Sequence, residues 1–597
     1  MHNKMQGGFH LLLATLLFVV LIIIGYWFYW DAASLPFSLI DDVSMFDHGK
    51  IVLSSLEQGG PVGLFADADP RFANSYRPSI DLVSAGLYLL ANLRMAHIVH
   101  LALLALTCLF IMMIAYRATG TRQALGALIG SWIGAVLFLT AEIPGATDFQ
   151  SLQANWFRLF TTDSYAVFFA SAGCFAILCA WRAKRWWSVW PLMLIGALLL
   201  MLVIFTKLIF APIALILLWV ICCAALIRKR NAAWSAFASL ILIASVICFY
   251  AGKTDLFSKG IQGQYTSQYA DATSNWLGTL SQYSTLIIDQ LFGIIFLWII
   301  LTLLLRYNRT IHLHPSRFIA GFFTEGMLII GAATFFVGYL AWPHIYARYM
   351  LGTTMFLCAL IGVLASQQLQ AVFAGRKLTN ILRNLLFILA GMAVVLICPT
   401  QYIIIVFVLL IITLWRSYGR QALHAFLLGI LLLGTAYIMK TGQISSRALK
   451  ADYVTAEHLR DTAVIPHIYS LWNDGKTIGV AVKTDNNIKN EVIASIADYA
   501  RQKGIVPRLT PITDLSTSAT KCDVLLHTSV LSPANLLPAT DEHLTSGSAI
   551  FALSKNEVAI PVSFSVWRNR VLKSCGKNYS LIENKPINDT WGFYCTK

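Results

Sequence analysis

Two adjacent aspartates, Asp41 and Asp42, are the residues of this chain best suited to acid–base chemistry. They come just after the first strongly apolar segment, so they should lie close to a membrane surface. A carboxylate there can take the proton of an acceptor hydroxyl as a general base, provided that its pKa lies near the working pH. Adjacent side chains of an extended segment point to opposite sides, so only one of the two is expected to act, and we favour Asp42. A helix cap or a plain surface loop is the alternative interpretation.

A second acid is ambiguous between Asp148 and Asp163. Asp148 lies in a short polar segment between two apolar runs, and Asp163 opens the next apolar run. Both positions are equally natural for a helix cap. The sequence leaves the choice open.

Four cations could contact a phosphate group. Arg348 lies at a junction where basic residues are otherwise rare, and a guanidinium can hold a phosphate with two parallel hydrogen bonds. Arg71 and Arg77 could act in the same way from the segment after Asp42, although each could instead extend to lipid headgroups. Lys207 is flanked by apolar residues on both sides, and an ionisable residue in such a position is a functional candidate.

The composition of the whole chain is that of a membrane protein. Of its 597 residues, 57% are hydrophobic, and the mean hydropathy is +0.68. Repeated apolar runs of about 20 residues are typical of transmembrane helices. The net charge of +15 would suit a nucleic acid, but most Lys and Arg residues lie in short segments between apolar runs, as the positive-inside rule predicts. We therefore expect no nucleic-acid partner.

The apolar windows predict an α-helical polytopic protein with about 13 transmembrane helices. They cover approximately residues 9–30, 96–116, 123–141, 164–181, 186–205, 208–227, 234–251, 284–305, 319–340, 349–366, 384–399, 401–415 and 421–439. Basic residues gather at every second junction: Arg117 and Arg122; Arg182, Lys184 and Arg185; Arg228, Lys229 and Arg230; Arg306, Arg309 and Arg317; Arg376, Lys377 and Arg383; Arg416 and Arg420. If the N-terminus is cytoplasmic, all these junctions are cytoplasmic and the C-terminus is external.

Two domains are expected. Residues 1–440 form the transmembrane domain, with a long first external loop at 31–95, and residues 441–597 form a small external α/β domain. In the loop, Ile51–Leu56 and Ile80–Leu93 have helical apolar spacing, which predicts short helices on the membrane surface.

The pattern beyond residue 440 predicts a strand at Thr477–Val482, a helix at Asn486–Lys503, and strands at Ile505–Leu509 and Asp523–His527. An external, oxidising compartment would allow a disulfide in this region, for which we favour Cys575 with Cys595.

Several other classes of site have no support in the sequence. Neither a CxxC pair nor a Cys/His pair has metal-ligand spacing, so no zinc site is expected. The patterns of nucleotide-binding loops, serine hydrolases and zinc proteases do not occur either.

As a set of short motifs, the chain resembles the GT-C superfamily of membrane glycosyltransferases, which use polyprenyl-phosphate-linked sugars. In order over roughly residues 1–366, the motifs are Ile40-Asp41-Asp42, Arg71-Phe72, Arg77-Pro78, Thr162-Asp163-Ser164-Tyr165, Phe205-Thr206-Lys207 and His344-Ile345-Tyr346-Ala347-Arg348-Tyr349. An external C-terminal domain is common in this superfamily.

The resemblance implies an external active site between the first two external loops and the membrane. The first-loop acid of the family maps to Asp41 or Asp42, as general base or acceptor-orienting group. The lipid-phosphate cations map first to Arg348, and then to Lys207, Arg71 and Arg77. Many relatives with monophosphate donors need no metal, so no cofactor is implied, with a divalent metal ion as the alternative.

The resulting hypothesis is an inverting glycosyltransferase of the bacterial inner membrane. It would move a hexose or pentose from undecaprenyl phosphate to a periplasmic glycan or lipid-linked glycan of the cell envelope, such as the O antigen of lipopolysaccharide. Its partners would be the lipid-linked donor, the glycan acceptor and membrane lipid.

Two other functions were weighed. An O-antigen polymerase or ligase predicts a large central external loop rich in Arg, whereas the segment 252–283 contains Lys253 and Lys259 but no Arg. A transporter or flippase predicts broken helices or repeats with ionisable residues at mid-membrane. Apart from Lys207, few ionisable residues lie in the predicted spans.

Overall fold

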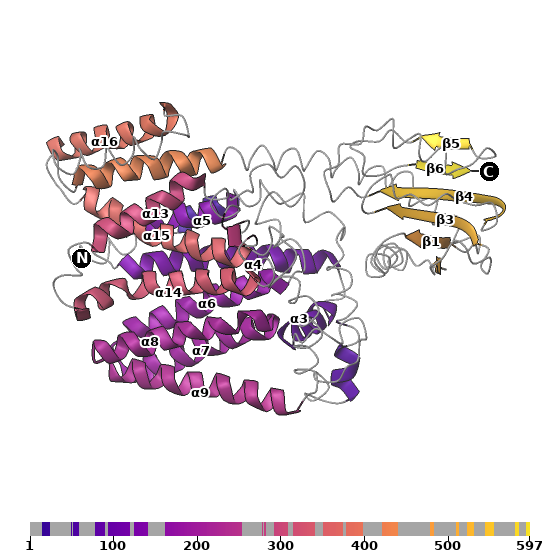
Figure 1. The fold of residues 1–597 in the computed structure, drawn as a ribbon, viewed down its shortest axis with the longest axis horizontal. Helices are drawn as coiled ribbons and strands as arrows, with labels where there is room; N and C mark the ends of the chain where they lie inside the picture. Colours follow the sequence, from indigo (N-terminus) through magenta and orange to yellow (C-terminus); the bar gives the residue numbers. More distant parts are fainter. Residues whose placement is uncertain are drawn as a thin grey trace.

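The computed structural model describes a bundle of helices and a β-sheet near the C-terminus (Figure 1). The described residues are 15–23, 49, 52–58, 78–89, 93–119, 124–140, 162–253, 278, 280, 281, 284, 292–307, 315–340, 350–373, 378–397 and 421–439, and the strands 478–482, 509–512, 522–529, 544–554, 580–583 and 593–596.

The helices of the bundle follow the predicted apolar segments closely. They are α3 (Pro78–Leu89), α4 (Leu93–Thr119), α5 (Ala124–Thr140), α6 (Thr162–Arg182), α7 (Trp186–Thr206), the 3-10 helix η4 (Leu208–Ala214), α8 (Leu215–Leu226), α9 (Arg230–Lys253), α13 (Phe292–Tyr307), α14 (Pro315–Leu340), α15 (Leu351–Phe373) and α16 (Leu378–Ile397). Another helix, Gln421–Met439, packs against α16.

Within the described residues, eight helices are long and apolar enough to cross a membrane, and three shorter apolar helices accompany them. The chain is therefore a multi-pass membrane protein, as the hydropathy predicts. The predicted span at 401–415 lies outside the described residues, so the count of about 13 stays a prediction.

Lys207 separates two helices that the sequence divides only weakly. Helix α7 ends at Thr206, and Lys207 has an extended backbone with φ −153° and ψ 126°. A 3-10 helix containing Pro212 then leads into α8. The continuous apolar stretch 186–226 is thus two crossings, as the alternation of basic junctions requires.

Helix α15 lies in the core of the bundle and packs closely on α5. Gly130 and Gly134 permit the approach: a Cβ atom on Gly134 would lie 2.5 Å from the carbonyl oxygen of Cys358, and one on Gly130 would overlap the backbone of Ser366. Gly391 and Gly429 play the same part where α16 crosses the helix Gln421–Met439. Small residues at such crossings are typical of membrane helices, which lack a strong hydrophobic drive to associate.

The segment 31–95, predicted as the first external loop, contains two described helices. One covers residues 52–58 and the other is α3, close to the predicted Ile51–Leu56 and Ile80–Leu93. The second helix ends at Leu89, and α4 begins at Leu93.

The C-terminal strands form one six-stranded sheet in the order β2-β1-β3-β4-β6-β5. The strands are β1 (Ile478–Val482), β2 (Leu509–Ile512), β3 (Cys522–Ser529), β4 (Leu544–Ser554), β5 (Ser580–Glu583) and β6 (Phe593–Thr596). Strands β2, β1, β3 and β4 run parallel to one another. Strand β6 is antiparallel to β4, and β5 is antiparallel to β6. Parallel neighbours need crossover connections, which fits an α/β domain.

The sheet corrects part of the sequence interpretation. The strand expected at Ile505–Leu509 begins only at Leu509, and β4, β5 and β6 had no counterpart in the prediction. The expected helix Asn486–Lys503 and the side chains of Cys575 and Cys595 lie outside the described part of the chain. The boundary at residue 440 stays a prediction.

Candidate functional site

Three polar side chains from separate helices meet inside the bundle. The Lys207 ammonium lies 3.1 Å from each carboxylate oxygen of Asp163 and 3.1 Å from the Tyr339 hydroxyl, to both of which it donates. The Tyr339 hydroxyl in turn donates to Asp163. An ammonium group has three N–H donors, so these oxygens can accept all of them.

The three residues lie at helix ends that favour their charges. Asp163 occupies the first turn of α6, where the partial positive charge of the helix N-terminus stabilises a carboxylate. Lys207 directly follows α7, where the free carbonyl groups of the last turn favour a cation. Tyr339 lies in the last turn of α14. The N-terminus of α6 and the C-termini of α7 and α14 therefore lie at the same end of the bundle.

The cluster is enclosed mainly on the carboxylate side. Asp163 and Tyr339 are buried, whereas the Lys207 side chain keeps 25% of its surface exposed against 4% for Asp163. Phe210 stands edge-on to the Tyr339 ring at a centroid distance of 5.6 Å. Gly338 allows α14 to approach η4, since a Cβ atom there would lie 3.0 Å from the carbonyl oxygen of Ile209. The ammonium is thus the part of the cluster that a ligand can reach.

The predicted first external loop is joined to the same end of the bundle. The Ser79 hydroxyl, at the start of α3, donates to the carbonyl of Leu202 in the last turns of α7 at 3.0 Å. Leu202 precedes Lys207 by five residues, so the beginning of α3 lies near the cluster.

A second buried polar contact lies beside Asp163. His100 Nε2 and the Tyr165 hydroxyl are 2.7 Å apart, and their rings meet edge to face at 5.6 Å. His100 belongs to α4 and is fully buried.

The sequence-predicted residues divide into two groups. Asp163 and Lys207, predicted separately as a second acid and a phosphate-binding cation, are brought into one ion pair. The others lie outside the described residues: Asp41, Asp42, Asp148, Arg71, Arg77 and Arg348. Their roles stay predictions.

Sequence reasoning missed Tyr339 entirely. A tyrosine at the end of an apolar run is normally part of the aromatic belt of a membrane protein. A partner 132 residues away from Lys207 leaves no local signal. The only trace in the sequence is a Gly-Tyr pair at the end of a span.

Asp163 and Tyr339 hold the Lys207 ammonium in place, but Asp163 is poorly suited to be a general base. Its carboxylate already accepts hydrogen bonds from both the ammonium and the hydroxyl, which engage both of its oxygens. Within the described residues, no three His, Cys, Asp or Glu side chains are arranged to hold a metal ion.

No protein-family model matches the chain, and no curated protein matches it. Among solved structures, the chain is similar to ArnT from Cupriavidus metallidurans, crystallised with undecaprenyl phosphate bound. The sequences are 13% identical, the match covers 98% of this chain and 97% of ArnT, and the TM-score is 0.44.

The resemblance to the GT-C superfamily rests on the sequence motifs and not on this match. With so low an identity and TM-score, the match bears no weight for the substrate or mechanism of this chain. Those are argued below from the side chains.

Proposed function

We propose that this protein is an inverting glycosyltransferase that moves one sugar from a polyprenyl-phosphate donor to a cell-envelope glycan. The proposed location is the bacterial inner membrane, with the N-terminus cytoplasmic and the active site and C-terminal domain periplasmic. The donor carrier would be undecaprenyl phosphate, the lipid named for the ArnT structure. The acceptor would be a periplasmic glycan such as the O antigen.

The observation that carries the proposal is the Asp163–Lys207–Tyr339 cluster. The cluster has a partly exposed ammonium at one end of a bundle of apolar helices, opposite the basic junctions. Ionisable groups inside membrane proteins are costly and usually serve a ligand pathway. The phosphate of a polyprenyl lipid lies at the membrane surface, the depth that this end of the bundle would reach.

A phosphate would use the exposed side of Lys207. Asp163 and Tyr339 hold the ammonium from the buried side, which fixes its position before a ligand arrives. Because its three N–H donors already have acceptors, the ammonium would stabilise the leaving group through its positive charge as the sugar departs. Arg348, Arg71 and Arg77 are the further cations proposed for this phosphate.

The base would come from the first external loop. Because Asp163 already forms the ion pair with Lys207, we assign the proton acceptor to Asp42, with Asp41 as the alternative. The loop end at α3 is attached to α7 near Lys207, so this loop can supply a residue to the same site. In an inverting transfer, the base deprotonates the acceptor hydroxyl as it attacks the sugar from the face opposite the phosphate.

Release of undecaprenyl phosphate from its sugar conjugates tests the proposal directly. Wild-type protein in proteoliposomes, supplied with polyprenyl-phosphate sugars and envelope glycan, should release the free lipid in step with glycan modification, as measured by mass spectrometry. Loss of a general base typically lowers such a rate by about 10²–10⁴-fold, which we expect for Asp42→Ala.

Asp67→Ala, which removes another acid of the same loop, is the matched control and should keep the wild-type rate. If Asp41→Ala and Asp42→Ala both keep full activity, the first-loop mechanism is wrong. If wild-type protein releases no lipid and surface glycans of a deletion strain are unchanged, the proposed function itself fails.

A further inference from the structure

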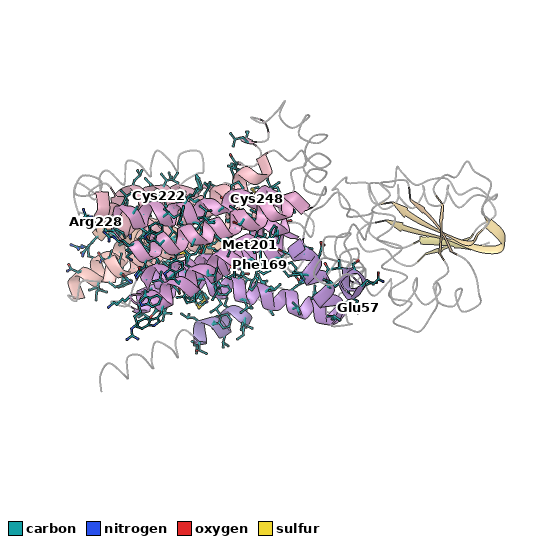
Figure 2. All side chains as sticks on the ribbon, turned by 90° about the horizontal axis from the view of Figure 1, so that it is seen from below. Glu57, Phe169, Met201, Cys222, Arg228 and Cys248 are labelled. Atoms are coloured by element: carbon teal, nitrogen blue, oxygen red, sulfur yellow. The ribbon has the colours of Figure 1, made fainter. Side chains whose placement is uncertain are left out.

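Basic side chains converge at the end of the bundle opposite Lys207. Arg117 lies in the last turn of α4, Arg182 ends α6, Lys229 follows α8 and Arg306 lies in the last turn of α13. In Figure 2, the label of Arg228, the neighbour of Lys229, marks this end of the bundle, and the label of Glu57 marks the opposite end. Four helices thus bring their C-terminal ends, and a cation each, to one end of the molecule.

Two of these cations are fixed by the backbone of a neighbouring helix. The Arg182 guanidinium donates to the carbonyl of Ala118 in the last turn of α4. The Lys229 ammonium donates to the carbonyl of Trp181 at 2.8 Å and stands 4.3 Å from the centre of its ring. Such contacts reduce the freedom of long side chains before any ligand binds.

The one described acid here is already engaged. Glu325 on α14 is 2% exposed, forms an ion pair with Arg306 at 3.2 Å and accepts a hydrogen bond from Gln367 at 3.0 Å. The negative charge of Glu325 also attracts the Arg182 guanidinium, whereas the positive charge of Arg117 repels it. Among the described residues, this end of the bundle therefore has four cations and one carboxylate, which interacts with Arg306 and Arg182.

The exposed cations repel one another. Burial lowers the pKa of Lys229, and the positive charge of Arg182 lowers it further. Arg117, Arg182 and Lys229 are all exposed at the surface. An anion placed among them would gain from each positive charge and would relieve their repulsion.

An aromatic layer lies beneath this group. Trp181 stacks on Phe323 with the rings parallel at 3.7 Å, and Trp219 donates to the carbonyl of Phe323 at 3.0 Å. Trp186 and Trp187 are exposed on α7 close by in sequence, as expected where helices pass through the headgroup region. This surface therefore lies at the level of lipid headgroups.

We propose that Arg117, Arg182 and Lys229 form a binding site for the phosphate of an anionic phospholipid, with the ion pair of Arg306 and the buried Glu325 beside it. Basic sites between membrane helices are suited to phosphate headgroups. A lipid is favoured over free phosphate because its acyl chains can lie along the exposed apolar residues of α8, such as Leu218 and Leu226. This site is separate from the proposed transferase site, at the other end of the bundle.

Lipid retention by purified protein tests the site. Wild type would be exchanged into micelles with phosphatidylglycerol or phosphatidylcholine, and bound lipid counted by native mass spectrometry. We expect one phosphatidylglycerol held more tightly than phosphatidylcholine. The double variant Arg182→Gln/Lys229→Gln should bind it about thirtyfold more weakly, from the typical contribution of a cation near an anionic lipid.

Lys184→Gln/Arg230→Gln is the matched control, since it removes two exposed positive charges from the same end of the bundle and should bind as the wild type does. Equal losses in both double variants would mean unspecific charge attraction and would overturn the site. Equal retention of the two lipids by the wild type would do the same.

Should the Arg182/Lys229 variant fail to fold, Arg117→Gln decides the question. It removes one charge from the site, and the expected loss is about fivefold. No loss with Arg117→Gln would overturn the proposal. Displacement of the lipid by inorganic phosphate at equal concentration would show that the site prefers the free ion, and would overturn the choice of lipid.

Discussion

At the scale of the residue, the central fact is that Lys207 and Asp163 are unequal partners. The carboxylate is almost fully enclosed, whereas a quarter of the lysine side chain is exposed. Removing one partner of a buried pair leaves the other charge uncompensated, and the cost grows with the burial of the charge that remains. The two single substitutions should therefore differ.

We expect Lys207→Met to destabilise the protein by about 3–5 kcal/mol, because it leaves the enclosed Asp163 carboxylate without its cation. Asp163→Asn should cost about 1–3 kcal/mol, since an amide can still accept from the ammonium, which keeps some contact with solvent. Thermal or denaturant unfolding of the detergent-solubilised protein measures both.

The double variant Asp163→Asn/Lys207→Met completes the cycle. It removes both charges together, so its cost should fall well below the sum of the two single costs. Additive losses would mean that the ion pair contributes nothing to stability.

At the scale of the element, the packing of α5 on α15 depends on glycine. A methyl group on Gly130 would meet the Ser366 backbone, which cannot rotate away as a side chain could. Gly86 on α3 has open space around the same position. The same substitution at the two sites therefore isolates the helix contact.

Gly130→Ala should destabilise the protein by about 1–3 kcal/mol through this overlap. Gly86→Ala should be neutral or stabilise it by up to about 1 kcal/mol, because alanine favours a helix. Unfolding temperatures of the two variants in one detergent would separate them. A loss of similar size in both would contradict the close approach of α5 and α15.

The helices could be predicted well from the sequence because each is an apolar run about as long as a membrane is thick. Even the break at Lys207 follows from the alternation of basic junctions. The pairing of Lys207 with Asp163 and Tyr339 could not be predicted from the sequence, because it joins three separate parts of the bundle and leaves no periodic pattern. The strand β2 was displaced because short strands at a sheet edge are defined by their partner, here Ile478 opposite Leu509.

At the scale of the whole molecule, the two ends of the bundle differ in chemistry. One end gathers the basic junctions and the proposed lipid site, and the other has the Asp163–Lys207–Tyr339 cluster and α3. The positive-inside rule makes the basic end cytoplasmic. This orientation is a prediction that labelling can test.

In a background with all eleven native cysteines replaced, Glu57→Cys and Arg228→Cys mark the two ends (Figure 2). A membrane-impermeant thiol reagent should label Glu57→Cys in spheroplasts and should label Arg228→Cys only after the membrane is permeabilised. The cysteine-free protein controls for background. Labelling of Arg228→Cys in intact spheroplasts would invert the orientation and place the proposed transferase site in the cytoplasm.

The spacing of the ion pair along the chain also has a consequence for biogenesis. Asp163 is synthesised 44 residues before Lys207, and Tyr339 follows 132 residues after it. When the ribosome delivers the α7–α8 hairpin to the insertion machinery, the Asp163 carboxylate that pairs with its lysine has already been synthesised as part of α6. The pair can therefore close while the chain is still growing, and the hydroxyl completes the cluster when α14 arrives.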